Sequence, residues 1–97
     1  MEQDITAIIP CYNEEKNIKH VIEGVAKYCS KIIVIDDSST DNSFEIVSSL
    51  KDDLNKKLMI VQNKKNMGIG YSMKKGISEA IKLDTKFIIK ILLNSFG

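Results

Sequence analysis

The sequence predicts an α/β fold in which a mostly parallel sheet of about four strands lies between helices on both of its faces. Short, continuously apolar and β-branched runs alternate along the chain with amphipathic segments at helical spacing. Strands that are apolar at every position are typical of parallel sheets covered by helices. The chain has 97 residues, which is enough for one domain, so we expect a single three-layer domain over residues 1–97.

The first strand and the first helix are predicted from the opening residues. Residues 5–9 (ITAII) form a short apolar run, which Pro10 is expected to end because proline has no N–H for a sheet. Apolar residues then recur at spacings of three and four, which indicates a helix. Asn13 is its predicted N-cap, and Glu14 and Glu15 suit the positive end of the helix dipole.

The remaining elements continue the alternation of strand and helix. Three further strands are predicted over residues 31–35 (KIIVI), 58–62 (LMIVQ) and 86–93 (KFIIKILL). Asn42, with Glu45 three positions later, resembles a capping box that opens a helix ending near Leu54. Another helix carries apolar residues at helical spacing from Ile69 to Ile81.

The loops that follow the first three strands carry most of the polar motifs. They are residues 10–17 (PCYNEEKN), 36–42 (DDSSTDN) and 63–70 (NKKNMGIG). Right-handed crossover connections bring the loops after parallel strands to the same edge of the sheet. Ligands of open α/β sheets bind in the crevice at that edge, so we expect the binding site where these loops meet.

Two adjacent carboxylates, Asp36 and Asp37, directly follow the predicted second strand. Neighbouring anions repel one another and lose hydration at a strand end, so something must compensate for them. An ion pair with Lys31 or Lys64 is one explanation, although it accounts poorly for two acids side by side. A ligand in the crevice that donates hydrogen bonds accounts for them better, while Asp41 is expected to cap the next helix.

Other nucleotide- and phosphate-binding classes do not fit these loops. Residues 10–17 contain no glycine, which excludes the G-x-G-x-x-G motif of dinucleotide-binding folds, and no P-loop motif is present. Gly68 and Gly70 follow the third strand, too late for either motif. A response-regulator receiver domain would place its acid pair after the first strand and an aspartate after the third, where this chain has Gln62 and Asn63.

The chain contains, in this order over residues 5–80, the segments IIPCYNEEKNIKHVI, IVIDDSSTDNS and NKKNMGIGYSMKKGISEA. In sequence and spacing these resemble the opening motifs of the family 2 glycosyltransferases, which have the GT-A fold. The resemblance implies the nucleotide-binding half of a GT-A domain, with strand order 3-2-1-4. It also implies a UDP- or GDP-linked sugar as the ligand, and transfer of that sugar to a hydroxyl of a lipid or saccharide acceptor.

The resemblance further implies which residues bind the nucleotide sugar. They are Pro10, Tyr12, Glu14, Asp36, Asp37, Asn66 and Gly68. A uracil or guanine ring offers N–H donors that a carboxylate accepts; Asp37 is favoured for this contact, while Asp36 orients the loop. Glu14 can accept hydrogen bonds from both hydroxyls of the ribose. Asn66 and Gly68 can also be interpreted as turn residues only.

The resemblance ends at the fourth strand. Members of the family carry a D-x-D motif there, whose carboxylates hold the Mg²⁺ or Mn²⁺ that stabilises the departing diphosphate. This chain has Leu92, Leu93 and Asn94 at that place, and the acceptor half with its general base does not follow. We therefore assign no catalytic residue, no metal ligand and no bound cofactor. We expect an inactive or weakly active piece, arising by truncation, frame shift or fragmentation.

Composition and charge limit the partners. The net charge of +1 gives no electrostatic footprint for nucleic acid, and no apolar run approaches the ~20 residues of a membrane span. The N-terminus lacks the layout of a signal peptide, and Cys11 and Cys29 lack metal-ligand spacing, so a cytoplasmic location with reduced thiols is expected. The fourth strand is expected at an outer edge, where its apolar run favours a homo-oligomer, most simply a two-fold dimer.

Two alternatives to a transferase stay open from the sequence. One is a non-catalytic nucleotide-binding or assembly module derived from such an enzyme. The other is an interaction protein whose polar loops are merely solvated. Nucleotide titration separates the second alternative from the rest, because a solvated loop would bind no nucleotide.

Overall fold

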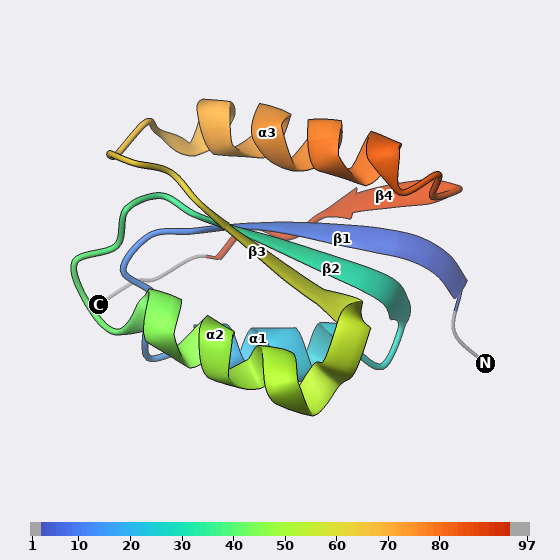
Figure 1. The fold of residues 1–97 in the computed structure, drawn as a ribbon, viewed down its shortest axis with the longest axis horizontal. Coiled ribbons are helices and arrows are strands. Elements are labelled where there is room, and N and C mark those ends of the chain that lie inside the picture. Colours follow the sequence, from blue (N-terminus) through green and yellow to red (C-terminus); the bar gives the residue numbers. More distant parts are fainter. Residues whose placement is uncertain (1–2, 94–97) are drawn as a thin grey trace.

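The computed structural model describes residues 3–93 as one four-stranded sheet with helices on both faces (Figure 1). The elements are β1 (Gln3–Cys11), α1 (Ile18–Val25), β2 (Cys29–Asp36), α2 (Ser43–Leu54), the 3₁₀ helix η1 (Asn55–Lys57), β3 (Leu58–Gln62), α3 (Ile69–Lys82) and β4 (Phe87–Lys90). All neighbouring strands are parallel, in the order β3-β2-β1-β4. This arrangement confirms the predicted fold class and the strand order that the resemblance implied.

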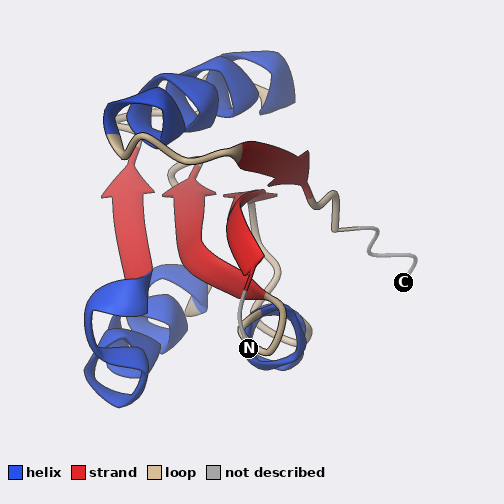
Figure 2. Ribbon diagram, turned by 90° about the vertical axis from the view of Figure 1, so that its right-hand side faces the viewer, coloured by secondary structure: helices blue, strands red, loops and turns tan. Residues whose placement is uncertain are grey.

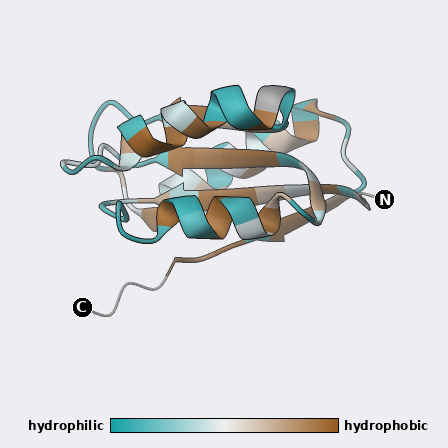
Figure 3. Ribbon diagram, turned by 90° about the horizontal axis from the view of Figure 1, so that it is seen from below, coloured by the Kyte–Doolittle hydropathy of each residue, from teal (hydrophilic) through white to brown (hydrophobic). Residues whose placement is uncertain are grey.

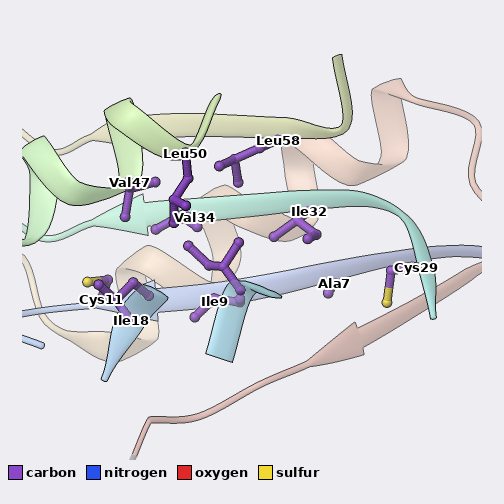
Figure 4. Close-up of a cluster of buried hydrophobic side chains, with 11 residues drawn as sticks. Ala7, Ile9, Cys11, Ile18, Cys29, Ile32, Val34, Val47, Leu50 and Leu58 are labelled. Atoms are coloured by element: carbon purple, nitrogen blue, oxygen red, sulfur yellow. The ribbon is translucent and has the colours of Figure 1, made fainter. Parts of the chain in front are cut away.

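The sheet separates two hydrophobic cores, with α1 and α2 on one face and α3 on the other (Figure 2). Figure 4 shows the first core, in which Ala7, Ile9, Ile32 and Val34 of the sheet meet Ile18 of α1 and Val47 and Leu50 of α2. The second core contains Ile8, Ile33, Ile35 and Ala80. Successive strand residues point to opposite faces, so the continuously apolar strands supply both cores, as their hydropathy in Figure 3 indicates.

Pro10 does not end the first strand, contrary to the sequence prediction. β1 continues to Cys11, and Pro10 is paired in register with β2. Successive residues of a strand direct their backbone groups to opposite neighbours. The Cys11 carbonyl accepts from Asp37 N on the β2 side, so the missing N–H of Pro10 lies on the β4 side. There β4 has already ended at Lys90, which pairs with Ile8, so the proline costs the sheet no hydrogen bond.

α1 begins later than predicted. Its N-cap is Asn17, whereas Asn13 has a φ of 52° and lies outside the helix. The Asn13 side chain is engaged elsewhere, because its Oδ1 accepts from the backbone N–H of Thr40 (2.8 Å) in the loop after β2. Glu14 and Glu15 therefore precede the helix, whose first turn contains no acid.

The capping box predicted at the start of α2 is not formed. The backbone N–H of Asn42 donates to Glu15 Oε2 (3.0 Å), so an acid from the first loop takes the place expected for Glu45. Asp41 caps the helix as expected, since its Oδ1 accepts from the backbone N–H (2.9 Å) and hydroxyl (2.6 Å) of Ser43. Burial raises the pKa of Asp41, but these hydrogen bonds outweigh burial and hold the pKa below its ordinary value.

β4 is shorter than the predicted strand over residues 86–93. The N–H of Ile91 still donates to the Ile8 carbonyl (2.9 Å), but residues 91–93 are not in a strand. β4 lies at the outer edge beside β1, as expected, and Phe87 is 60% exposed there. Asn94, where the sequence departs from the D-x-D motif, lies outside the described residues.

Candidate functional site

The loops after β1, β2 and β3 meet at the carboxyl ends of the strands, at the left of Figure 1. Direct hydrogen bonds join the first two loops. Asn13 N donates to Ser39 Oγ (3.0 Å), and Glu14 N donates to Ser43 Oγ (2.8 Å). Together with the Asn13–Thr40 contact, these bonds fix the two loops in one arrangement.

Asp37 joins the third loop to the second. Its carboxylate accepts from the backbone N–H groups of Met67 (2.7 Å) and Gly68 (2.9 Å) and from Asn63 Nδ2 (2.8 Å). Burial raises the pKa of Asp37, but the bonds from Met67, Asn63 and Gly68 outweigh it and hold the pKa below its ordinary value. Asp37 is therefore an ionised carboxylate, 5% exposed, that holds the β3–α3 loop against the end of β2.

Asp36 is fully buried and turns toward a different set of donors. Its carboxylate accepts from Ser39 Oγ (2.7 Å), Ser39 N (3.1 Å) and Gln62 Nε2 (3.3 Å). Lys31 reaches instead the carbonyl of Lys56 (3.4 Å), away from the acid pair. Neutral donors from the loops after β2 and β3 and from the end of β3 thus compensate the two adjacent charges, and no ion pair of either aspartate occurs within residues 3–93.

A cavity of about 170 Å³ lies at this edge of the sheet, beside the first turns of α3. It is lined by Pro10, Cys11, Tyr12, Glu14, Asp37, Ile69, Ser72 and Leu93. Ligand cavities are typically about 300–1,000 Å³, so this one has room for part of a nucleotide rather than for a whole nucleotide sugar. Four of the seven residues implied by the resemblance line this cavity, namely Pro10, Tyr12, Glu14 and Asp37.

The other three implied residues do not line the cavity. Asp36 is fully buried, and its carboxylate accepts from Ser39 and Gln62. Gly68 precedes α3 with a φ of 93°, a conformation that favours glycine, and serves Asp37 as a backbone donor. Asn66 is exposed on the same loop and is not among the residues that line the cavity.

Glu14 and Tyr12 give the cavity its polar wall. Glu14 is 7% exposed, and among the described residues its carboxylate accepts from Asn17 Nδ2 alone, through a long contact of 3.4 Å. A buried carboxylate with free acceptor positions favours a ligand that brings hydroxyl or N–H donors. Tyr12 is 45% exposed, which leaves part of its ring open to a ligand.

Sequence reasoning missed two residues that support the site. Asn63, 3% exposed, donates through Nδ2 to both Asp37 (2.8 Å) and Ser72 Oγ (2.9 Å). Ser72 is fully buried and lines the cavity from α3. A polar residue directly after a strand, and a serine on the inward face of an amphipathic helix, were the signals that could have found them.

Cys11 also lines the cavity, but as a neutral thiol. Burial, followed by the negative charge of Asp36, raises the pKa of Cys11 to about 12. A thiol that stays protonated is a poor nucleophile and a poor metal ligand. Within residues 3–93 no group of three or more His, Cys, Asp or Glu residues is placed to hold a metal ion. No helix in the same range is long and apolar enough to cross a membrane.

Comparison with known proteins points to one family. The protein-family model described as glycosyl transferase family 2 matches residues 6–82 of this chain. The UDP-N-acetylglucosamine--dolichyl-phosphate N-acetylglucosaminyltransferase of Methanococcus voltae is 32% identical over 91 residues, covering 81% of this chain and 36% of its own. The poly-beta-1,6-N-acetyl-D-glucosamine synthase of Staphylococcus aureus is 33% identical over 81 residues, covering 80% of this chain and 19% of its own.

A solved structure shares the fold and contains a nucleotide. The crystal structure of Staphylococcus aureus TarS 1–349 in complex with UDP matches with a TM-score of 0.78 at 26% identity, over 91% of this chain and 26% of that one. The chain spans 36% of the length of the Methanococcus relative and 19% of that of the Staphylococcus synthase.

Proposed function

Because this chain belongs to glycosyltransferase family 2, we propose that its cavity binds the nucleoside of a UDP-linked sugar and that the sugar goes to an acceptor hydroxyl. The observation that carries the proposal is the pair of buried carboxylates, Glu14 and Asp37, in the wall of one cavity at the carboxyl ends of the strands. Two related proteins support the choice of nucleotide, since TarS was crystallised in complex with UDP and the name of the Methanococcus relative includes UDP-N-acetylglucosamine.

The contacts of Asp37 favour uracil over guanine. A carboxylate has about four acceptor positions, and Met67, Gly68 and Asn63 occupy three of those of Asp37. One position remains for a ligand. Uracil presents a single ring N–H, whereas guanine presents a ring N–H and an amino group side by side and is best bound by two free acceptors. We therefore narrow the ligand from UDP or GDP to the uridine class.

Glu14 is the proposed ribose acceptor. Its free carboxylate positions match the two donors of a ribose diol.

The substrate that receives the sugar is proposed only as a broad class, since the names of two relatives specify dolichyl phosphate and a polymer of N-acetylglucosamine. We propose a lipid or saccharide acceptor for the whole protein.

Calorimetric titration with UDP, uridine and GDP tests the proposal. We expect UDP and uridine to bind and GDP to bind at least roughly tenfold more weakly, because guanine would leave a donor unpaired. Asp37→Ala should abolish binding, whereas Asp53→Ala, which removes an exposed acid from α2, should leave it unchanged. No binding of any nucleotide at millimolar concentration would leave only the interaction-protein alternative.

A second titration isolates the ribose contact without disturbing the loops that Asp37 holds. The wild-type chain should prefer UDP over 2′-deoxy-UDP, and Glu14→Gln should narrow that preference, because a neutral amide accepts hydrogen bonds less strongly. Equal preferences in the wild type and in Glu14→Gln would exclude Glu14 as the ribose acceptor.

A transfer assay separates the enzyme from the non-catalytic alternative. Both would bind uridine nucleotides, but only a transferase would move the sugar to an acceptor. The cytoplasmic location stays a prediction; it rests on Cys11 and Cys29, which are buried and form no disulfide.

A further inference from the structure

A second, larger hollow lies against the β3–α3 loop and the first turns of α3. It has a volume of about 430 Å³ and is lined by Asn63, Lys64, Lys65, Met67, Tyr71 and Lys75. The two hollows have no lining residue in common. The proposed nucleotide site therefore leaves this one unexplained.

The hollow is strongly cationic in a chain that is nearly neutral. Lys64, Lys65 and Lys75 line it, whereas the net charge of the whole chain is only +1. Within residues 3–93 no salt bridge joins any of the three to an acid, and no acid lines the hollow. The nearby Asp37 is engaged by its own three donors. Charges of one sign gathered in a concave surface focus the field on a ligand of opposite charge.

Lys75 is half-buried, and its ammonium group lies beside a buried amide and an aromatic ring. Its Nζ lies 5.8 Å from the centre of the Tyr71 ring and 3.5 Å from Asn63 Oδ1. Asn63 is itself fixed, because it is 3% exposed and its Nδ2 donates to Asp37 and Ser72. An ammonium group placed by a buried amide and an aromatic ring loses less conformational freedom when it binds an anion.

We propose that this hollow binds the phosphate group of a phosphomonoester, at a site separate from the nucleoside cavity. A phosphomonoester carries a charge of about −1.5 to −2 at pH 7 and three strong acceptor oxygens, which suit three ammonium groups. Lysine binds phosphate as a point charge, and the 430 Å³ volume leaves room for the group that bears the phosphate. The ligand is either a soluble phosphomonoester or a lipid with a phosphomonoester headgroup.

NMR titration of the whole chain with glycerol 3-phosphate tests the site. Amide shifts should move at Lys64, Lys65, Tyr71 and Lys75, with saturating uridine present or absent. Uridine alone should move shifts around the other cavity, so failure of the nucleotide proposal and failure of this one give different results. Phosphate-induced shifts that spread over lysines throughout the chain would overturn the proposal.

Matched lysine variants separate a built site from general charge. Lys75→Gln, and the double variant Lys64→Gln with Lys65→Gln, should each weaken binding roughly tenfold, the loss expected for a charge-assisted hydrogen bond. Lys75→Arg should retain binding. Lys74→Gln is the control, because it removes the same charge from an exposed neighbour on α3 that lines neither of the two hollows. An equal loss in Lys74→Gln, or no loss in either set, would refute the proposal.

Vesicles distinguish the two sources of the phosphate. Phosphatidylcholine vesicles with and without phosphatidic acid present the same phosphomonoester on a membrane. Binding that needs both phosphatidic acid and Lys75 indicates that the hollow also accepts a lipid headgroup. Binding of glycerol 3-phosphate alone indicates a soluble ligand. Binding of neither would overturn the proposal.

Discussion

At the scale of single residues, Asp37 holds the β3–α3 loop in place, and we expect its substitution to reduce stability. In Asp37→Asn the amide NH₂ would meet N–H donors instead of accepting from them. The Met67 and Gly68 bonds would be weakened. Hydrogen bonds to charged groups contribute about 1.5–3 kcal/mol each, so a loss of at least that size is expected in the free energy of unfolding by urea at pH 7.

The same variant has a predicted pH signature. The pKa of Asp37 is lower in the folded chain than in the unfolded one, where it is near 3.9. The stabilisation by its charge is therefore complete above about pH 5 and is lost as the pH falls through the folded-state pKa. The stability difference between the wild type and Asp37→Asn should shrink between about pH 5 and pH 3. A difference that stays constant over this range would show that the charge contributes nothing.

Thr6 is a buried residue whose hydroxyl has no hydrogen-bond partner among the described residues. A buried hydroxyl without a partner costs roughly 1–3 kcal/mol, so Thr6→Val should raise the free energy of unfolding by about 1 kcal/mol. Thr6→Ser is the matched comparison, because it keeps the hydroxyl and removes the methyl group, and it should be destabilising. Thermal unfolding of both variants checks the prediction. Loss of stability in Thr6→Val would show that the hydroxyl is satisfied.

The residue scale also shows where sequence reasoning reaches its limit. The place of Asp36 and Asp37 at a strand end could be predicted, because local hydrophobicity defines the strand. The partners of Asp37 could not be predicted, because the Met67 and Gly68 donors come from a loop about 30 residues away in the sequence. Asn66 was grouped with the site because of its motif, yet the loop exposes it to solvent.

At the scale of elements, every predicted strand and helix is present, but the ends differ wherever another element decides them. β3 has the predicted bounds, since nothing but its own apolar run defines them. The N-cap of α1 is Asn17 rather than the predicted Asn13, because Asn13 forms a hydrogen bond with the loop after β2. No local capping rule includes such a contact. Pro10 stayed within β1 because its neighbour β4 stops short.

Close packing of α3 on the sheet leads to a prediction about glycine. A Cβ added at Gly76 would lie within 2.3 Å of Ile8 Cγ2, and Ile8 is fully buried and β-branched. Gly76→Ala should therefore destabilise the chain by about 1–3 kcal/mol, despite the helix propensity of alanine. Gly70→Ala, on the same helix with open space around it, should instead stabilise it by up to about 1 kcal/mol. Urea unfolding measures both, and equal effects would contradict the packing argument.

At the scale of the whole molecule, the outer edge of β4 favours self-association. Its backbone groups have no further strand in the described sheet, and Phe87 is 60% exposed beside them. The exposed Lys86 and Lys90 oppose pairing through repulsion, so a two-fold dimer should be strengthened by salt. Light scattering at high concentration should detect it. Phe87→Lys should abolish the dimer. Ile81→Lys, which changes a similarly exposed residue on α3, should not. A chain that stays monomeric at high salt would contradict the prediction.

The last prediction is that this 97-residue chain binds its nucleotide without help from Mn²⁺ and transfers sugar poorly or not at all. Transfer is expected to be poor because we assign neither a general base nor a metal ligand to this chain. A general base typically contributes 10²–10⁴-fold to the rate, and a Lewis-acid metal lowers the barrier by several kcal/mol more. Asp36 and Asp37 are unsuited to a cation, because N–H donors that a cation would have to displace already occupy their oxygens. Asp84 lies between α3 and β4, whose first residue pairs with Ile5 near the start of β1, at the opposite end of the strands from the cavity.

UDP affinity should therefore change by less than about twofold when Mn²⁺ is added, because the nucleoside contacts alone hold the ligand. Hydrolysis of UDP-N-acetylglucosamine should stay at the uncatalysed rate with and without Mn²⁺. The control is the same UDP titration in EDTA, which removes the metal ion and leaves the nucleotide unchanged. Metal-dependent turnover would show that carboxylates other than those around the cavity complete the site, and would identify this chain as a working transferase.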